Sequence, residues 1–180
     1  MRTISDIHVL IVDDNRQMRF LLRSLLRAAG IGRVSEASNA AQAFDVMTMW
    51  PVDLVLVDWK MRPTDGLTFT RMIRHASNSP NPHVTILMLT AHTEASRVAA
   101  ARDAGVSGFL KKPISAQLLF DRIGGALTDS RVFVRTHDFF GPDRRFGATA
   151  GYCGPFRRAT DRAGAGEMID LDDEAMRWSA

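Results

Sequence analysis

The stretch of sequence that decides the fold is residues 8–14, HVLIVDD. Residues 8–12 form a short apolar run, and Asp13 and Asp14 end that run with two carboxylates. An apolar run without alternation is typical of a strand buried on both faces, as in a parallel sheet that helices cover from both sides. The stretch therefore predicts a central strand followed by an acidic loop at its carboxyl end.

The same unit, an apolar strand followed by an amphipathic helix, recurs along the chain. Further strands are predicted at residues 34–37, 53–57, 84–89 and 107–110. Helices are predicted at 16–29, from a cap at Ser38 or Asn39 to Pro51, at 67–75, at 93–104, and from a cap at Ser115 to 127. Strict alternation implies right-handed crossovers. The expected fold class is α/β, a doubly wound five-stranded parallel sheet followed by a C-terminal tail.

Composition excludes several classes of protein. Of 180 residues, 46% are hydrophobic and 24% are charged, which is the balance of a globular chain rather than a disordered one. Cys153 is the one cysteine, so neither an intrachain disulfide nor a cysteine-rich zinc site can form. No apolar run approaches the roughly 18 residues that span a bilayer, and residues 1–6 lack a signal-peptide pattern. We therefore expect a cytoplasmic protein without membrane contact.

Reactive side chains stand at the carboxyl ends of four predicted strands. The acidic pair Asp13-Asp14 follows the first strand, Asp58 the third, Thr90 the fourth and Lys112 the fifth. Ligand sites of doubly wound sheets lie beyond these ends, so we expect the groups to converge. Clustered carboxylates repel one another, and a cation such as Mg²⁺ relieves that repulsion through oxygen ligands. A carboxylate beside the cation can then form an acyl phosphate, while a hydroxyl and an ammonium group stabilise the transferred phosphoryl group.

Four ordered stretches resemble the receiver domains of two-component response regulators of the chemotaxis regulator type. They are VLIVDDNRQMR (9–19), VLVDWKMRPTDGL (55–67), MLTAH (88–92) and GFLKKP (108–113). The resemblance covers about residues 6–128. It implies a flavodoxin-like (βα)₅ receiver domain over residues 1–129, followed by a C-terminal extension over 130–180 that we do not expect to be an independent domain.

The resemblance assigns roles to the acidic groups. It implies that Asp58 accepts the phosphoryl group and that Asp13 and Asp14 hold Mg²⁺ together with Asp58. The backbone carbonyl of Lys60 would complete the metal ligands that the protein supplies. Mg²⁺ is therefore the expected cofactor.

Other matched positions concern the response to phosphorylation. Thr90 matches the hydroxyl residue that follows the phosphoryl group, and Lys112 matches the lysine that pairs with it. Pro113 would follow a cis peptide bond, which fixes where Lys112 points. Phe109 occupies the aromatic switch position, although a purely structural role in the core fits the same residue.

The loop after the acceptor carries both a match and a departure. Lys60 and His92 match positions that face the acyl phosphate and tune its hydrolysis, and a plain surface role is the alternative for His92. The family's Met-Pro is here Met61-Arg62-Pro63, which places the proline one residue later. We expect this change to alter the shape of the loop or to bring Arg62 near the phosphoryl group.

The resemblance implies a signalling role. A histidine kinase or a histidine phosphotransfer protein would phosphorylate Asp58, drawing Thr90 inward and letting Phe109 follow. The face formed by the fourth helix, fifth strand and fifth helix would then bind a downstream protein differently in the two states. A phosphorelay shuttle or phosphate sink is the alternative. With no second catalytic apparatus, we expect no enzyme activity beyond the protein's own phosphorylation and dephosphorylation.

The net charge of +3 averages three different regions. Residues 1–129 carry 15 Lys and Arg against 12 Asp and Glu, residues 130–162 carry seven Arg and three Asp, and residues 163–180 carry one Arg and five acidic residues. The middle region repeats the pattern aromatic-x-Gly-Pro-x-Arg-Arg at 139–145 and 152–158. Gly-Pro favours a turn that the Arg pair would leave as a cationic fork.

Three interpretations of this extension remain open. It can be an arm whose aromatic side chains cover a face of the receiver, a docking motif for an acidic protein partner, or a nucleic-acid contact. The lack of Lys and the acidic end at 167–174, which can fold back on the Arg pairs, weigh against nucleic acid. No helix-turn-helix spacing follows residue 127, so we expect no DNA-binding output domain.

Overall fold

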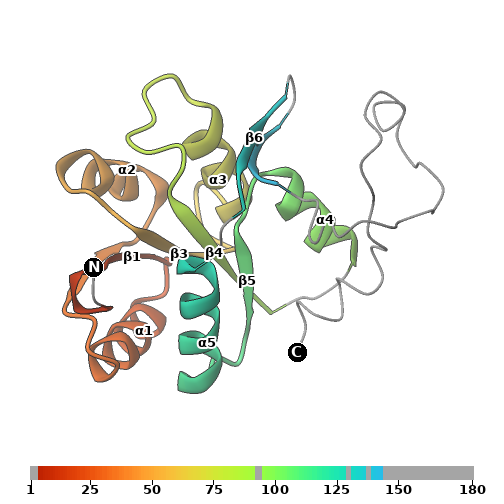
Figure 1. Ribbon diagram of the computed structural model, residues 1–180. Helices are drawn as coiled ribbons and strands as arrows, with labels where there is room; N and C mark the ends of the chain where they lie inside the picture. Colours follow the sequence, from red (N-terminus) through yellow and green to blue (C-terminus); the bar gives the residue numbers. More distant parts are fainter. Residues whose placement is uncertain (1–3, 92–94, 129–130, 137–138, 144–180) are drawn as a thin grey trace. The chain divides into compact units, whose positions relative to one another are not determined.

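A five-stranded parallel sheet in the order β2-β1-β3-β4-β5 forms the centre of the fold (Figure 1). The computed structural model describes residues 4–91, 95–128, 131–136 and 139–143. The strands are β1 (His8–Val12), β2 (Arg33–Ala37), β3 (Leu54–Asp58), β4 (Thr85–Thr90) and β5 (Gly108–Lys111). The predicted α/β fold class is confirmed. Because the strand order reverses between β1 and β3, their carboxyl ends flank the crevice where doubly wound folds bind ligands.

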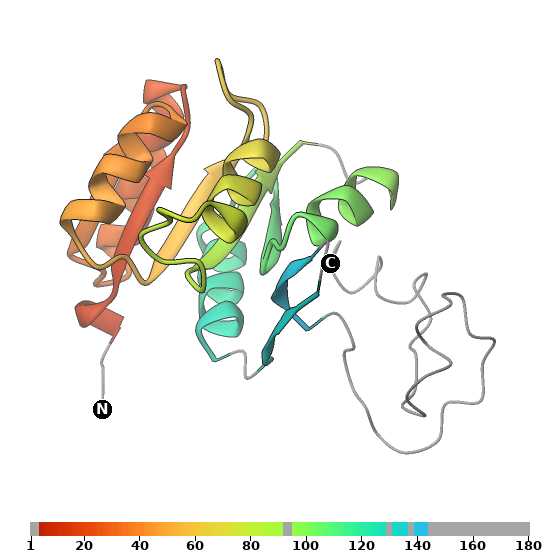
Figure 2. The ribbon, with the colours of Figure 1, turned by 90° about the horizontal axis from the view of Figure 1, so that it is seen from above.

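Helices cover both faces of the sheet (Figures 1 and 2). They are α1 (Arg16–Ala28), α2 (Ala40–Met49), α3 (Gly66–His75), α4 (Ala95–Asp103) and α5 (Ala116–Leu127), and a short 3-10 helix, η1 (Ile4–Asp6), precedes β1. Helices α1 and α5 lie on one face, α2 and α3 lie on the other, and α4 lies beside β5. Within the described ranges, no helix has the length and apolar character needed to cross a bilayer.

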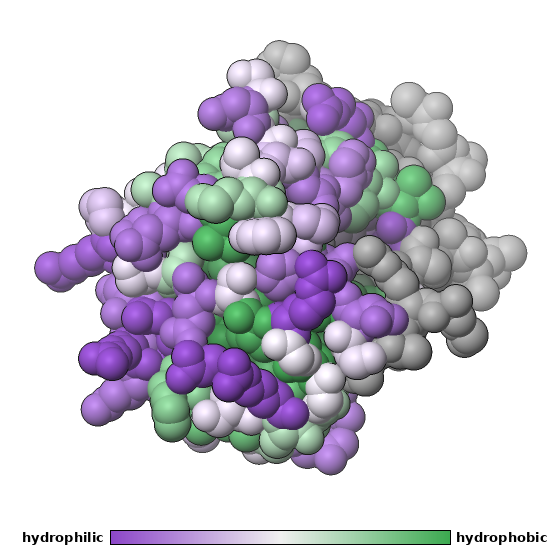
Figure 3. Space-filling model, turned by 90° about the vertical axis from the view of Figure 1, so that its left-hand side faces the viewer, coloured by the Kyte–Doolittle hydropathy of each residue, from purple (hydrophilic) through white to green (hydrophobic). Residues whose placement is uncertain are grey.

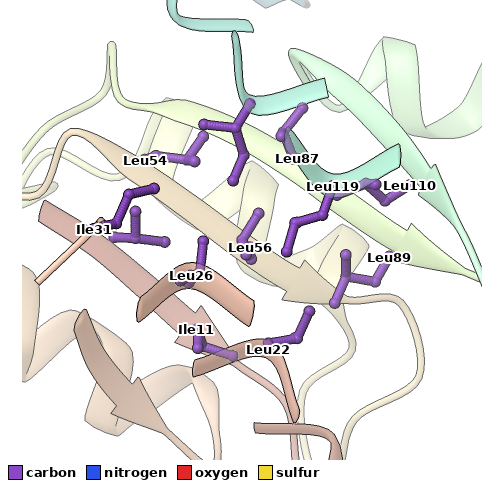
Figure 4. Close-up of a cluster of buried hydrophobic side chains, with 12 residues drawn as sticks. Ile11, Leu22, Leu26, Ile31, Leu54, Leu56, Leu87, Leu89, Leu110 and Leu119 are labelled. Atoms are coloured by element: carbon purple, nitrogen blue, oxygen red, sulfur yellow. The ribbon is translucent and has the colours of Figure 1, made fainter. Parts of the chain in front are cut away.

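The main core lies between the sheet and helices α1 and α5 (Figure 4). Successive strand residues point to opposite faces, so every second side chain of a strand joins this core. Its fully or nearly fully buried members are Val9, Ile11, Leu22, Leu26, Ile31, Leu54, Leu56, Leu87, Leu89, Leu110, Leu119 and Ile123. Burying one such aliphatic side chain stabilises the fold by about 1.5–3 kcal/mol. The core fixes the sheet, and the sheet fixes the spacing of the residues at its carboxyl edge.

Strand ends differ from the predicted ones by a single residue, and the difference concerns the site. Strand β3 includes Asp58, which pairs with Leu89, and β4 includes Thr90, which pairs with Lys111. The apolar runs predict that Asp58 and Thr90 come just after their strands, because a polar residue follows each run. Backbone pairing continues through both residues, so their backbones are held by the rigid sheet rather than by a loop.

Helix caps agree well with the sequence. Asn39 rather than Ser38 is the N-cap of α2, and its side chain accepts a hydrogen bond from the Gln42 backbone N–H at 3.0 Å. Ser115 caps α5 as predicted. Helix α5 continues through the glycine pair at 124–125 to Leu127, because both glycines lie within the turns that Leu119 and Ile123 anchor in the core.

A small hairpin that follows α5 was not predicted. Strands β6 (Phe133–Arg135) and β7 (Phe140–Pro142) pair antiparallel, and one compact unit of the chain runs from Met1 to Pro142. The expected Gly-Pro turn of the first repeat is wrong, since Gly141 and Pro142 lie within β7. Gly141 is needed there because a Cβ would lie 2.7 Å from the Cα of Gly105.

The rest of the extension falls beyond this hairpin. The first Arg pair, at 144–145, the second repeat at 152–158 and the acidic end at 167–174 lie outside the described residues. Among the described residues of the extension, Phe133 and Phe140 make ring contacts with His83, which precedes β4.

Large apolar side chains on the surface are scattered rather than gathered on one element. Figure 3 views the molecule from the side of α1 and α2, where hydrophilic and hydrophobic residues are interspersed. The exposed members among the described residues are Phe20, Leu21, Met49, Trp50, Met72 and Val132. Single exposed apolar residues are ordinary on protein surfaces.

Candidate functional site

Three charged side chains from distant parts of the chain meet at the carboxyl edge of the sheet. Asp13 directly follows β1, Asp58 is the last residue of β3, and Lys112 directly follows β5. The Lys112 Nζ lies 2.7 Å from Asp58 Oδ1 and 3.6 Å from Asp13 Oδ2. Asp13 and Asp58 are only 1% and 7% exposed. The sheet thus brings together a lysine and two buried carboxylates that the sequence separates by up to about one hundred residues.

Both carboxylate oxygens of Asp58 have partners. Oδ1 pairs with Lys112, and Oδ2 accepts a hydrogen bond from the backbone N–H of Lys60 at 3.1 Å. Behind Asp58, Gly66 at the start of α3 packs against the Asp58 carbonyl oxygen so closely that a Cβ would overlap it. Lys112 and the Lys60 N–H therefore orient the carboxylate, and Gly66 packs against the backbone behind it.

Asp13 is held less completely. Its Oδ1 accepts a hydrogen bond from the backbone N–H of Asn15 at 2.8 Å, and its Oδ2 has no hydrogen-bond partner among the described residues. Burial raises the pKa of the Asp13 carboxyl, and the negative charges of Asp58 and Asp14 raise it further. The Asn15 hydrogen bond and the Lys112 charge oppose that rise without cancelling it. Asp13 is thus a buried carboxylate short of positive partners.

This donor set fits a hard divalent cation. Asp13 Oδ2 has no hydrogen-bond partner among the described residues, so it is available to a cation. Carboxylate oxygens are ligands that Mg²⁺ prefers. Asp14 and Lys60 are exposed. Among the residues that the structure describes, no three His, Cys, Asp or Glu side chains are grouped as a ready metal site. Lys112 currently supplies the positive charge between Asp13 and Asp58.

The two expected switch residues lie on β4, which is next to β3 in the sheet, and on β5, the edge strand beyond β4. Thr90 is buried at the end of β4, and its carbonyl oxygen accepts a hydrogen bond from the Lys112 backbone N–H at 2.8 Å. Phe109 is buried on β5 opposite Met88. The Lys112–Pro113 peptide bond is cis. Position 92 lies outside the described residues, so the expected tuning role of His92 stays a prediction.

The loop from Trp59 to Asp65 connects Asp58, at the end of β3, to α3. The Trp59 backbone donates to the Leu89 carbonyl at 3.0 Å, and Asp65 caps α3 by accepting from the Thr68 N–H at 2.7 Å. Where the proline is shifted, the Arg62–Pro63 peptide bond is cis and the Arg62 side chain is exposed. The loop keeps both of its ends fixed despite its unusual sequence.

Sequence reasoning missed one residue that supports the acidic loop. Arg19 donates from Nη1 to the backbone carbonyl of Asp13 at 2.7 Å, and from Nε to Glu36 Oε2 at 3.2 Å. Arg23 also binds Glu36, at 2.6 Å. Long side chains on a helix point toward its N-terminus, so an Arg one turn beyond the N-cap Asn15 is placed to reach back to the loop. That spacing indicates that Arg19 can reach back toward the loop, but only the folded loop shows that its partner is the Asp13 carbonyl.

Comparisons with known proteins agree with one another. The family model described as "Response regulator receiver domain" matches residues 9–124. The chain is similar to the chemotaxis protein CheY of Pseudomonas aeruginosa, with 32% identity over 64% of this chain and 91% of the relative. CheY-3 of Vibrio cholerae is 31% identical over 64% of this chain and 87% of the relative. The solved structure of Vibrio cholerae CheY4 has a TM-score of 0.63 and 26% identity, and covers 67% of this chain and 98% of that one.

Proposed function

Because the chain belongs to the family of response regulator receiver domains, we propose that Asp58 is its phosphoacceptor and that phosphorylation of Asp58 controls binding to a partner protein. The observation that carries this proposal is the position of Asp58, buried at the carboxyl end of β3 and bound by Lys112 at 2.7 Å. A histidine kinase or a histidine phosphotransfer protein is the donor. The protein acts as a signalling regulator, and the chemistry it performs is confined to its own carboxylate.

In the proposed transfer step, Asp58 is the attacking group. An Asp58 carboxylate oxygen attacks the phosphorus of a phosphohistidine, the phosphorus–nitrogen bond breaks, and the imidazole leaves with the electron pair and takes up a proton. Lys112 then pairs with a phosphoryl oxygen instead of the free carboxylate. The Lys60 backbone N–H, 3.1 Å from Asp58 Oδ2, keeps the carboxylate oriented during attack.

Receiver domains of this family generally bind Mg²⁺ for phosphorylation. In this chain Asp13, Asp14, Asp58 and the Lys60 carbonyl would hold the ion. When bound, Mg²⁺ supplies positive charge that offsets the negative charge developing on the phosphoryl oxygens. Asp13 supports that role because its Oδ2 has no hydrogen-bond partner among the described residues.

Phosphorylation of Asp58 would change the conformation of residues on β4 and β5. Thr90 and Phe109 are the switch residues in this proposal. Both are buried, and the backbones of β4 and β5 are paired from Leu87–Gly108 to Thr90–Lys111. Movement of the Thr90 hydroxyl toward the phosphoryl group opens space for the Phe109 ring, which changes the face formed by α4, β5 and α5. A downstream protein on that face then binds the two states with different affinity.

A relay shuttle or a phosphate sink remains the competing role. Both roles use the same acceptor, so the lifetime of the acyl phosphate separates them. A long lifetime together with a phosphorylation-dependent binder supports the switch. Rapid hydrolysis, or return of the phosphoryl group to a histidine, supports the shuttle or sink.

Trp59, adjacent to the acceptor, offers the test. In a Trp50→Phe, Trp178→Phe background, Trp59 is the one remaining tryptophan. Its fluorescence should change on adding Mg²⁺ and again on adding beryllofluoride, a phosphoryl mimic. Asp58→Ala should abolish the response to beryllofluoride, whereas Asp45→Ala on the exposed side of α2 should leave it intact. No response of the parent protein to either addition would overturn the proposed function.

A further inference from the structure

The β6–β7 hairpin occupies a defined surface of the receiver. Phe140 is 4% exposed, and its ring centroid lies 4.9 Å from that of His83 and 5.6 Å from that of Phe133. The Arg135 guanidinium lies 4.4 Å from the Phe140 centroid. The contact with His83 joins the hairpin to the receiver, whereas the other two lie within the hairpin. A two-stranded hairpin alone is marginally stable in water, so contacts with the receiver are needed to hold it.

Arg74 of α3 joins the hairpin to the body of the receiver. Its Nε donates to the Gly105 carbonyl at 2.9 Å and its Nη1 to the Pro82 carbonyl at 2.6 Å, while its guanidinium lies 5.1 Å from the Phe133 ring centroid. Arg74 is 1% exposed, and burial lowers its pKa to about 9, so it remains cationic at neutral pH. The hairpin therefore covers a buried cation, which makes its contact with the receiver specific rather than merely apolar.

Backbone meets backbone at two glycines. Gly105, between α4 and β5, has a φ of +90°, and a Cβ there would lie 2.5 Å from the Phe140 carbonyl oxygen. A Cβ on Gly141 would lie 2.7 Å from the Gly105 Cα. With no side chain between them to absorb a displacement, movement of the segment around Gly105 must either carry the hairpin along or break the contact.

The same segment leads directly to the functional site. Arg131, just before β6, donates from Nη2 to the Ser107 carbonyl at 2.7 Å. Ser107 is bound to β4 twice, by its N–H to the Ile86 carbonyl at 2.8 Å and by its Oγ, which accepts from the Ile86 N–H at 3.0 Å. Strands β4 and β5 begin next to Ile86 and Ser107. Their other ends are Thr90 and Lys111, and Lys111 is next to Lys112. Hairpin and phosphorylation site thus lie at opposite ends of one pair of strands.

We propose that the surface around Arg74, His83 and Gly105 is an intramolecular docking site for the β6–β7 hairpin, and that the hairpin docks more tightly in the unphosphorylated state. The inference rests on the proposed function. The hairpin is docked while Lys112 pairs with Asp58, a contact that phosphorylation of Asp58 would replace, and this gives the coupling its proposed direction. Coupling between two sites is reciprocal, so a protein with a weakened hairpin favours the phosphorylated state by the same factor.

Hydrogen exchange measures the first half of this coupling. Amide exchange of residues 133–142 is followed in the full chain with Mg²⁺, before and after adding beryllofluoride. Exchange should become at least about fivefold faster with beryllofluoride, the lower end of typical coupling between sites. It should stay unchanged in Asp58→Ala.

Affinity for beryllofluoride measures the second half. Phe140→Ala should bind it at least about fivefold more tightly than the parent protein, by Trp59 fluorescence, because loss of the docked hairpin removes a bias toward the unphosphorylated state. Val132→Ala, at a position 73% exposed in the same segment, is the matched control and should bind as the parent does. Arg131→Gln removes one hydrogen bond without opening a cavity and should act in the same direction as Phe140→Ala, which keeps the test decisive if Phe140→Ala fails to fold.

The outcomes separate the inference from the proposed function. If Trp59 responds to beryllofluoride while the exchange of residues 133–142 and the variants' affinities stay within about twofold of the parent, the docking inference is wrong and the proposed function stands. If Trp59 gives no response at all, the proposed function fails first. Slower hairpin exchange with beryllofluoride would reverse the sign of the coupling and overturn the inference.

Discussion

Lys112 Nζ lies 2.7 Å from Asp58 Oδ1, so the carboxylate of the proposed phosphoacceptor already has a lysine partner. The same ammonium group lies 3.6 Å from Asp13 Oδ2. One cation therefore serves two carboxylates that are also the expected ligands of Mg²⁺. In the proposed function, the lysine and Mg²⁺ would compete for this negative charge until a phosphoryl group provided oxygens for both.

This competition predicts tighter metal binding when the lysine charge is removed. Lys112→Gln should bind Mg²⁺ roughly fivefold more tightly, which corresponds to about 1 kcal/mol of Coulomb energy at a partly exposed site. Isothermal titration with Mg²⁺ at low ionic strength measures the affinity. Lys111→Gln removes a neighbouring but exposed lysine and serves as the control. Weaker Mg²⁺ binding by Lys112→Gln would show that the lysine organises the metal site instead of opposing it.

Asp13 predicts a pH-dependent cost in stability. Burial raises the pKa of its carboxyl in the folded protein, whereas in the unfolded chain it titrates near 3.8. As pH rises, the Asp13 carboxyl loses its proton first in the unfolded chain. The free energy of unfolding therefore falls between the pKa of the unfolded chain and the higher pKa of the folded protein, and the whole loss is present at neutral pH. Without metal, Asp13→Asn should therefore be more stable than the parent at neutral pH, and this gain should disappear below about pH 3.8.

Urea denaturation in the presence of a chelator, at neutral and acidic pH, checks the Asp13 prediction. The Asn side chain can still accept the Asn15 hydrogen bond through its carbonyl oxygen, so the local loop is retained. Asp45→Asn on the exposed side of α2 controls for the amide itself. A loss of stability for Asp13→Asn at neutral pH would mean that the carboxylate is better compensated than its surroundings indicate.

Substitution of Gly66 is expected to cause a packing defect directly behind Asp58. In Gly66→Ala the new methyl group would overlap the Asp58 carbonyl oxygen, which belongs to the rigid backbone. We expect a loss of about 2 kcal/mol or more in the free energy of unfolding, typical of overpacking, together with weaker Mg²⁺ binding. Gly125→Ala, in an exposed turn of α5 with open space around it, should instead gain about 0.5–1 kcal/mol. Equal effects of the two substitutions in thermal denaturation would refute the packing argument.

Arg74 predicts that a lysine cannot replace it. Arg74→Lys loses one of two hydrogen bonds to the Gly105 and Pro82 carbonyls, because an ammonium group cannot match the planar fork. The unfolding free energy should fall by about 1–2 kcal/mol. Arg71→Lys on the exposed side of α3 is the control and should change stability by less than about 0.5 kcal/mol. An unchanged free energy of unfolding for Arg74→Lys in chemical denaturation would show that the guanidinium of Arg74 is not needed for hairpin docking.

The fold and much of the site could be predicted from the sequence because local signals and global topology agree. Apolar runs ending in Asp13 and Asp58 mark both the strands and the edge where ligands bind. Once the sheet order is known, the distance between Lys112 and Asp58 follows from pairing in register. Resemblance added the roles of the individual residues, which spacing alone leaves open.

The hairpin and the supporting Arg19 could not be predicted for different physical reasons. Strands β6 and β7 have only three residues each and draw their stability from Arg74 and Gly105, which are distant in the sequence. The sequence around Gly141 predicts a turn, but Gly141 lies in a strand, where the absence of a side chain allows close approach to the Gly105 backbone. Arg19 reads as a surface charge on α1, and only the folded loop reveals the Asp13 carbonyl within its reach.

Incorporation of a phosphoryl group at Asp58 tests the central claim most directly. The full chain is incubated with Mg²⁺ and acetyl phosphate, a small phosphoryl donor, and its intact mass is measured and mapped by proteolysis after trapping the acyl phosphate. We predict a gain of one phosphoryl group, located on Asp58, that requires Mg²⁺ and is absent in Asp58→Asn but present in Asp45→Asn. Failure of the parent protein to gain a phosphoryl group, or a gain that survives in Asp58→Asn, would contradict the account.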